Sequence, residues 1–362
     1  MSYRFGNAFG IPEGVTSRSA GISALTLLLL SVPSFAASQD PSPQTAKPTF
    51  RSAVDLVSVA AVVRDKRGRF ARNLKKEDFI VQEGGSRRDL VEFHADDNAP
   101  VRVALLFDVS GSMRVSARVE EARQAARHVL GALRLGDGAD EAAVFSFDMN
   151  LQWLQPFTAD AGAIEQALSR VQPYGQTSLY DAIAQTARRV ADARPGDQRR
   201  RAVVVLTDGI DTSSLMKPEE VSAIASAIDV PVYVVTVVSE VDRDRDARDR
   251  EKTGEAETPL QALSRWTGGE LFVTSAPAHE SVAARQIIDE LRHQYVLAFT
   301  ASPSAGWHSL SVKTRDRDLT VRARSGYKAG THAGSESPQA DGTVPERGAA
   351  YRVPEALDNE KE

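Results

Sequence analysis

The sequence contains no cysteine among its 362 residues. This excludes disulfide bonds, thiolate nucleophiles, and zinc or iron–sulfur sites built on cysteine. An excess of one charge is also lacking, because 44 Lys and Arg residues stand against 49 Asp and Glu residues, a net charge of −5. Nucleic-acid-binding proteins usually carry a basic surface. The charge balance therefore argues against nucleic acid as a partner.

Long apolar runs are absent apart from residues 20–32, which include four consecutive leucines. This run follows Arg4 and Arg18 and precedes the small residues Ser34 and Ala36, which is typical of an export signal cleaved after Ala36. We therefore expect a signal peptide at 1–36, no membrane span in the mature chain, and a periplasmic or extracellular location. An uncleaved N-terminal anchor is the alternative.

The segments at the two ends of the remaining chain have little apolar periodicity. Residues 37–51 are rich in Pro, Ser, Gln and Thr, which predicts a linker. Residues 329–362 mix Gly, Ser, Glu and Pro and cannot bury enough surface to offset the entropy lost on ordering, so we expect a disordered tail. Neither segment is expected to contribute chemistry.

The central part of the chain has strands alternating with helices. Continuous apolar runs occur at 103–107, 142–147, 202–206 and 230–238, with a weaker strand at 270–273. Helical patterns separate them, at 114–133, 160–171, 179–193, 218–228 and 259–266, and a last helix is expected at 279–292. This alternation predicts a doubly wound, mostly parallel, Rossmann-like α/β sheet covered by helices on both faces. We assign it to residues 97–292.

Short β patterns flank this region on both sides. One set lies within 52–96 and the other within 293–328, where strands are expected at 295–300, 308–314 and 319–323. Each set alone makes a marginal sheet. We therefore expect both to combine into one small β-sandwich-like domain, into which the α/β domain is inserted. Two separate β units are the alternative.

Polar clusters follow two of the buried strands and precede one helix. The first is Asp108-Val109-Ser110-Gly111-Ser112, the second surrounds Thr177, and the third is Thr207-Asp208-Gly209. Ligands of open parallel sheets bind outside the carboxyl ends of the strands, so these clusters are expected to converge. Two carboxylates and three hydroxyls are hard oxygen donors that suit Mg²⁺, with Mn²⁺ or Ca²⁺ as alternatives. Neutral hydroxyls leave the ion much of its positive charge. An incoming carboxylate would balance that charge and complete the shell of ligands.

The five residues resemble a known motif. Asp108, Ser110 and Ser112 in D-x-S-x-S spacing, with Thr177 and Asp208, are similar to the metal-ion-dependent adhesion site of von Willebrand factor type A domains. The resemblance implies that Ser110 and Ser112 bind the ion directly, Thr177 directly or through water, and the two aspartates largely through water. With its flanking β segments, the chain further resembles bacterial exported proteins related to this family, known mainly from acidobacteria.

Simpler interpretations exist for the individual residues. Ser110 or Ser112 could cap a helix beginning at Arg114. Asp181 lies near enough in sequence to be considered as a sixth ligand, but an acid in the first turn of a helix is the better interpretation. The six histidines show no metal-ligand spacing, Arg199-Arg200-Arg201 is interpreted as a solvated loop, and the mixed-charge run 242–257 as a mobile insert.

Two functions of different classes follow. In the first, which we favour, the protein is not an enzyme, and its divalent ion captures an acidic residue of a protein partner. In the second, the sheet supports metal-assisted phosphoryl hydrolysis. Phosphatases of that shape need Asp-x-Asp after the first strand, whereas position 110 is serine. The signature loops of P-loop nucleotide hydrolases and of serine hydrolases are absent from the sequence.

Overall fold

The computed structural model describes residues 56–115, 118–192, 197, 199–237, 257–274 and 276–329. The expected signal peptide, the linker, the tail from residue 330 onward and the charged run 242–256 lie outside these residues. Within the described part of the chain, no helix has the length and apolar character needed to cross a membrane.

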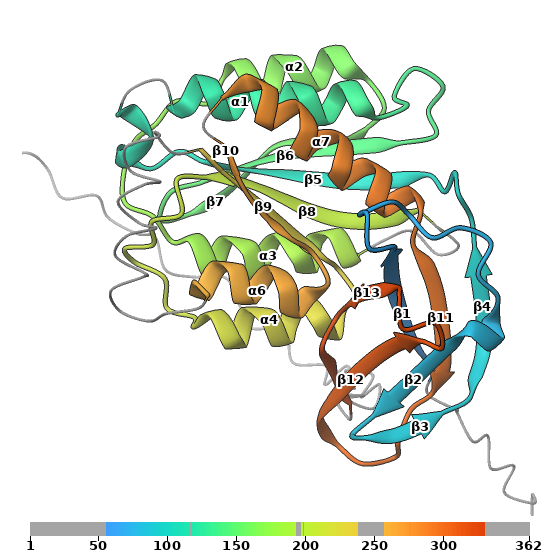
Figure 1. The fold of residues 1–362 in the computed structure, drawn as a ribbon. Coiled ribbons are helices and arrows are strands. Elements are labelled where there is room, and N and C mark those ends of the chain that lie inside the picture. The colour runs from blue at the N-terminus through green and yellow to red at the C-terminus, as the bar shows by residue number, and fades with distance from the viewer. Residues whose placement is uncertain are drawn as a thin grey trace, which may run out of the picture. The chain divides into compact units, whose positions relative to one another are not determined.

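A six-stranded sheet, here called the central sheet, forms the middle layer of the α/β region (Figure 1). Its strand order is β10-β9-β8-β5-β6-β7, and all neighbours are parallel except β6 and β7. The strands are β5 (Val101–Asp108), β6 (Glu141–Phe147), β7 (Leu151–Thr158), β8 (Arg200–Thr207), β9 (Val232–Val237) and β10 (Leu271–Thr274). Every residue of β5 and β9 is buried, which explains their continuous apolar sequences.

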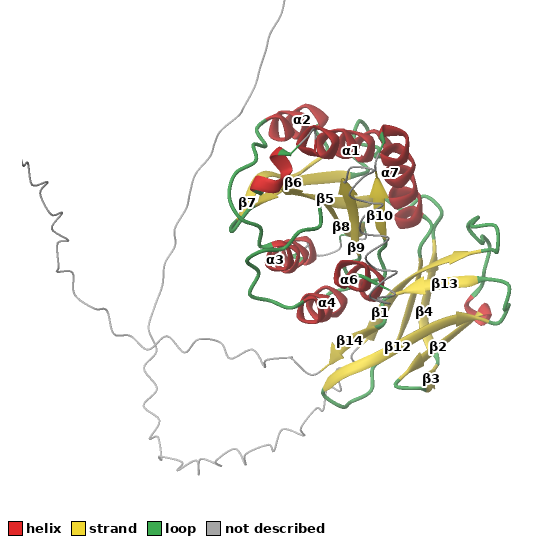
Figure 2. Cartoon of the chain, turned by 60° about the vertical axis from the view of Figure 1, so that its left-hand side comes forward, coloured by secondary structure: helices red, strands yellow, loops and turns green. Residues whose placement is uncertain are grey.

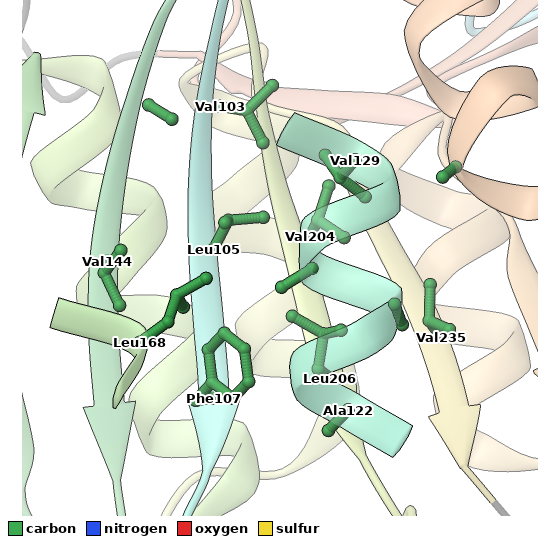
Figure 3. Close-up of a cluster of buried hydrophobic side chains, with 14 of the residues drawn as sticks. Val103, Leu105, Phe107, Ala122, Val129, Val144, Leu168, Val204, Leu206 and Val235 are labelled. Atoms are coloured by element: carbon green, nitrogen blue, oxygen red, sulfur yellow. The ribbon is translucent and has the colours of Figure 1, made fainter. Parts of the chain in front are cut away.

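Helices cover both faces of the central sheet (Figure 2). One face packs against α1, α2 and α7, and the other against α3, α4 and α6. The helices are α1 (Arg118–Ala132), α2 (Ala161–Ser169), α3 (Leu179–Ala191), α4 (Pro218–Ala227), α6 (Pro259–Thr267) and α7 (Pro277–Arg292), with short 3-10 turns η1 (Lys76–Asp78) and η2 (Gly111–Arg114). Successive side chains of a strand point to opposite faces of a sheet. Val204 and Leu206 therefore enter the apolar core under α1 (Figure 3), whereas Val203 and Val205 enter the core on the opposite face of the central sheet.

Two small antiparallel sheets are built from the segments on either side of the α/β region. Their orders are β13-β1-β11-β4 and β14-β12-β2-β3. The strands are β1 (Leu56–Arg64), β2 (Phe79–Glu83), β3 (Ser86–Arg88), β4 (Leu90–Ala95), β11 (Tyr295–Thr300), β12 (Gly306–Thr314), β13 (Thr320–Ala323) and β14 (Gly326–Ala329). β1 pairs with β11 and β2 pairs with β12, and side chains from both flanks share one apolar core. The predicted fold class is confirmed, and the alternative of two separate β units is wrong.

Three details differ from the predicted elements. The edge strand β7 falls in a stretch for which no element was expected, because its side chains are largely half-buried or exposed and lack an apolar run. The helix expected from residue 114 begins at Arg118, after the 3-10 turn η2. The strand β14 extends to Ala329, the first residue of the expected tail. The domain limits themselves stay predictions.

Candidate metal centre

Asp108 is the last residue of β5, and its side chain is fully buried. One carboxylate oxygen accepts a hydrogen bond from the Ser110 backbone N–H at 2.9 Å, and the other accepts one from the Thr207 hydroxyl at 2.6 Å. Burial raises the pKa of Asp108 from 3.8 to about 6, although hydrogen bonds from Ser110 and Thr207 oppose this rise. The nearby charge of Asp208 adds to the rise. A cation beside this pair of acids would stabilise their ionised forms.

Ser110 and Ser112 lie in the loop that follows β5, and their hydroxyl oxygens are 3.0 Å apart. Ser110 occupies the N-cap position of η2 but makes no capping hydrogen bond, and α1 begins only at Arg118. The capping interpretation of these serines is therefore wrong. Neighbouring ligands of an octahedral Mg²⁺ at about 2.1 Å lie about 3.0 Å from each other. The two hydroxyls thus have the separation that adjacent positions in such a shell require.

The segment containing Thr177 is tied to the serine loop through the backbone. The N–H of Gly111 donates to the carbonyl of Gly175 at 2.8 Å. Gly175 has a φ of +100°, and a side chain there would meet the carboxylate of Asp148, so a glycine is required for this approach. Thr177 is buried, and its backbone N–H donates to the hydroxyl of Thr212 at 3.0 Å. The loop after β8 thereby fixes the position of the threonine.

Asp208 follows the end of β8 and completes the predicted set. Its carboxylate accepts a hydrogen bond from the Ile210 backbone N–H at 3.2 Å and forms an ion pair with Arg118 at 3.0 Å. Thr207, the residue before it, donates to Asp108, so the ends of β5 and β8 are joined directly. These contacts bring together the three loops in which the five predicted residues lie.

Asp181 does not point toward this cluster. It lies in the first turn of α3, as expected, and its two carboxylate oxygens accept from the backbone N–H groups of Leu215 and Met216 at 2.9 and 2.8 Å. Nearby, Asp211 accepts from the N–H of Leu179 at 2.9 Å. Both acids therefore hold the loop after β8 against the start of α3.

The sequence predicted neither Arg118 at this site nor the contact of Thr207 with Asp108, although Thr207 lies in the third polar cluster. The position of Thr207 at the end of a buried strand, one residue before Asp208, offers a usable signal, because a hydroxyl there can reach the neighbouring strand. Arg118 offers none, since it lies ten residues after Asp108 on a helix and its pairing with Asp208 depends on the fold.

The donor set suits a hard divalent cation, because it combines hydroxyl and carboxylate oxygens with an adjacent pair of serines. Among the described residues, no group of three or more His, Asp or Glu side chains is placed to hold a metal. Any ion at this position would depend on the neutral hydroxyls of Ser110, Ser112 and Thr177. Such an ion would keep most of its positive charge.

The fold and these loops define an α/β domain with a polar cluster at the carboxyl ends of its strands. Residues 103–211 match the family model of the von Willebrand factor type A domain. Over this part of its length, the chain is therefore similar to domains of that type. The matched residues include all five of the predicted site.

Individual proteins and solved structures are also similar to this chain. The chain is 33% identical over 124 residues to the thrombospondin-related anonymous protein of Plasmodium falciparum, covering 32% of this chain and 22% of that protein. The chain thus spans about a fifth of that relative's length. Among solved structures, BatB from Bacteroides thetaiotaomicron is 18% identical with a TM-score of 0.43, covering 53% of this chain and 98% of BatB. A von Willebrand factor type A protein from Catenulispora acidiphila is 13% identical with a TM-score of 0.43, covering 77% and 76%.

Proposed function

We propose that this protein is an exported binding module that captures an acidic residue of a protein partner through a divalent ion. Ser110 and Ser112 would hold the ion directly with their hydroxyls, Thr177 directly or through water, and Asp108 and Asp208 largely through bound water. Mg²⁺ is the proposed ion, with Mn²⁺ or Ca²⁺ as alternatives. The observation that carries the proposal is that contacts between the three loops bring the five residues to the joined ends of β5 and β8, where the hydroxyls of Ser110 and Ser112 are hydrogen-bonded to each other at 3.0 Å.

The role of the partner's carboxylate follows from charge. The ion would supply a Lewis-acidic, positively charged centre that is only partly neutralised by the protein. Arg118 already pairs with Asp208, which further reduces the negative charge facing the ion. A carboxylate from a partner would then complete both the coordination and the charge balance.

The surface around the loops supports a protein as the partner. Four large apolar side chains in these loops are exposed, namely Val115, Tyr174, Ile210 and Leu215, the last to 93%. Exposed apolar groups that gather in one region commonly mark a protein interface. A partner would bury these side chains around the ion-bound carboxylate.

Phosphoryl hydrolysis is the weaker alternative. Position 110 is serine, and in the described residues no histidine forms a hydrogen bond with the five site residues. A general acid or base beside the ion would therefore have to be Asp108 or Asp208, the same carboxylates that are proposed to act on the ion. The domain type is also typically non-enzymatic. Turnover of a phosphomonoester by the wild type, lost in Asp108→Ala, would reverse this preference.

Calorimetric titration of Mg²⁺ and Mn²⁺ into the chelator-treated full chain tests the proposal. We expect saturable binding by the wild type and at least about tenfold weaker binding by Ser110→Ala/Ser112→Ala, which lacks two direct ligands. A matched control, Ser169→Ala/Ser304→Ala, removes two exposed serines away from the loops and should bind as the wild type does. Equal binding of Mg²⁺ and Mn²⁺ by all three proteins, or no binding by any of them, would contradict the proposal.

A further inference from the structure

A cavity lies at the opposite end of β8 from the candidate metal centre. It has a volume of about 350 Å³ and is lined by residues of β1, β8 and β11 and of the segments that precede β8, β9 and β11. The lining includes Arg199, Arg200 and Arg201. Because β8 runs eight residues from Arg200 to Thr207, this cavity is about 25 Å from Asp208. The arginine run that was predicted to be a solvated loop therefore borders a pocket instead.

Arg200 has an unusual environment for a guanidinium group. It is the first residue of β8, and its backbone N–H donates to Pro100 at 2.8 Å, so its position is fixed. Its Nε atom is buried and has no hydrogen-bond partner among the described residues. Burial lowers the pKa of Arg200, and Asp96 and Asp229 oppose this only at a distance. An unpaired, partly buried cation is costly, and such a group calls for a counterion.

The two acids that line the cavity are already paired with other arginines. Asp197 contacts Arg102 at 3.1 Å and Arg199 at 3.2 Å, and Asp229 contacts Arg324 at 3.4 Å. Neither of them forms an ion pair with Arg200 within the described residues.

Arg201 adds a second positive charge that forms no ion pair with a carboxylate of the described residues. Its two terminal nitrogens donate to the backbone carbonyls of Ala191 and Asp197, each at 3.3 Å. Within the described residues, neither Arg200 nor Arg201 is therefore neutralised by a direct ion pair.

The remaining lining favours an organic anion over a bare ion. Ser58 and Gln294 offer neutral polar groups, while Ile228, Pro231 and Val296 form an apolar part of the wall. The volume exceeds what a single inorganic anion fills and lies within the range of small-molecule sites. A planar guanidinium fork recognises phosphate and carboxylate oxygens in the same way.

We propose that this cavity binds a small organic anion, whose phosphate or carboxylate head pairs with Arg200 and whose apolar body lies against Ile228, Pro231 and Val296. The site is independent of the divalent ion, because the two lie at opposite ends of β8.

Thermal unfolding of the full chain, followed by tryptophan fluorescence at constant ionic strength, tests this proposal with four probes. The probes are phenyl phosphate, benzoate, inorganic phosphate and the neutral phenol. We expect phenyl phosphate or benzoate to raise the unfolding temperature of the wild type in a saturable manner, because a ligand that binds only the folded state stabilises it. Phenol should have no effect, and inorganic phosphate a smaller one. Stabilisation by phenol equal to that by the anions would overturn the proposal, as would no response to either organic anion.

Variants then locate the site. Arg200→Gln should weaken anion binding at least about tenfold, because it removes a charge-assisted contact. Without ligand, this variant should unfold at the same or a higher temperature, since the wild type buries an unpaired charge. Arg87→Gln alters an exposed arginine of β3 and should respond as the wild type does. An undiminished response of Arg200→Gln would contradict the assignment.

Discussion

At the scale of single residues, the hydroxyl of Thr207 adds a side-chain contact to the backbone pairing that joins the ends of β5 and β8. It donates to the fully buried carboxylate of Asp108 at 2.6 Å. Thr207→Val keeps the shape of the side chain but leaves this carboxylate with one partner fewer. We expect a loss of about 1–3 kcal/mol in the free energy of unfolding by urea. The control Thr320→Val, at an exposed position of β13, should change it little; a similar loss in both variants would contradict the assigned role.

Glu280 provides a prediction on pH. It lies buried in the first turn of α7, and one of its carboxylate oxygens has no hydrogen-bond partner among the described residues. Burial, assisted by the charge of Glu121, raises its pKa from 4.5 to about 7. The folded protein therefore keeps this carboxyl neutral where the unfolded chain has ionised it. The stability contributed by the neutral form is full below pH 4.5 and is lost as the pH rises through about 7.

Glu280→Gln removes this dependence. The variant should be more stable than the wild type by about 1–3 kcal/mol at about pH 8, and the difference should shrink toward about pH 5. Urea unfolding of both proteins at both pH values measures this difference in the free energy of unfolding. A difference that grows as the pH falls would show that Glu280 is ionised in the folded protein.

At the scale of elements, the loop between α2 and α3 depends on a glycine. Gly175 has a φ of +100°, and an added Cβ would lie 3.2 Å from an Asp148 carboxylate oxygen. Gly175→Ala should therefore destabilise the fold by about 1–2 kcal/mol and weaken Mg²⁺ binding, because Thr177 follows two residues later. Gly131→Ala, in α1 with open space around it, should instead stabilise by about 0.5–1 kcal/mol. Thermal unfolding and Mg²⁺ titration of both variants check this; opposite signs of the stability change are the expected result.

Most elements could be predicted from the sequence because β5, β8 and β9 are buried on both faces and read as continuous apolar runs. The edge strand β7 could not, because only one strand pairs with it and its side chains are partly exposed. The three polar loops could be singled out in the sequence because two of them follow buried strands and the third precedes a helix. The pairing of Arg118 with Asp208 could not be predicted, and neither could the lack of a hydrogen-bond partner for Arg200 Nε among the described residues. Both depend on which groups the fold places beside them.

At the scale of the whole molecule, a buried ionic cluster joins α7 to the flanking β strands. Glu290 of α7 is fully buried and pairs with Arg64 of β1 at 2.9 Å and with Arg322 of β13. Arg322 also pairs with Glu270. Removing one partner of a buried pair leaves an uncompensated charge. The β strands and the α/β region should therefore unfold together.

Glu290→Gln tests this coupling. We expect the free energy of unfolding of the variant to be about 2–3 kcal/mol lower than that of the wild type. In the wild type, circular dichroism and tryptophan fluorescence should report one common unfolding transition. Glu165→Gln breaks a half-exposed pair with Arg127 and should cost less than about 1 kcal/mol. Equal losses in the two variants, or separate transitions in the wild type, would contradict a structural link through Glu290.

The most direct test of the central claim is a crystal of this protein grown or soaked with Mn²⁺, with anomalous differences measured at the manganese absorption edge. We expect one strong peak at the carboxyl ends of β5 and β8, within coordination distance of the Ser110 and Ser112 hydroxyls. The same experiment on Ser110→Ala/Ser112→Ala should give no peak there. A peak elsewhere in the wild type, or none at saturating Mn²⁺, would contradict the proposal that these loops hold a divalent ion.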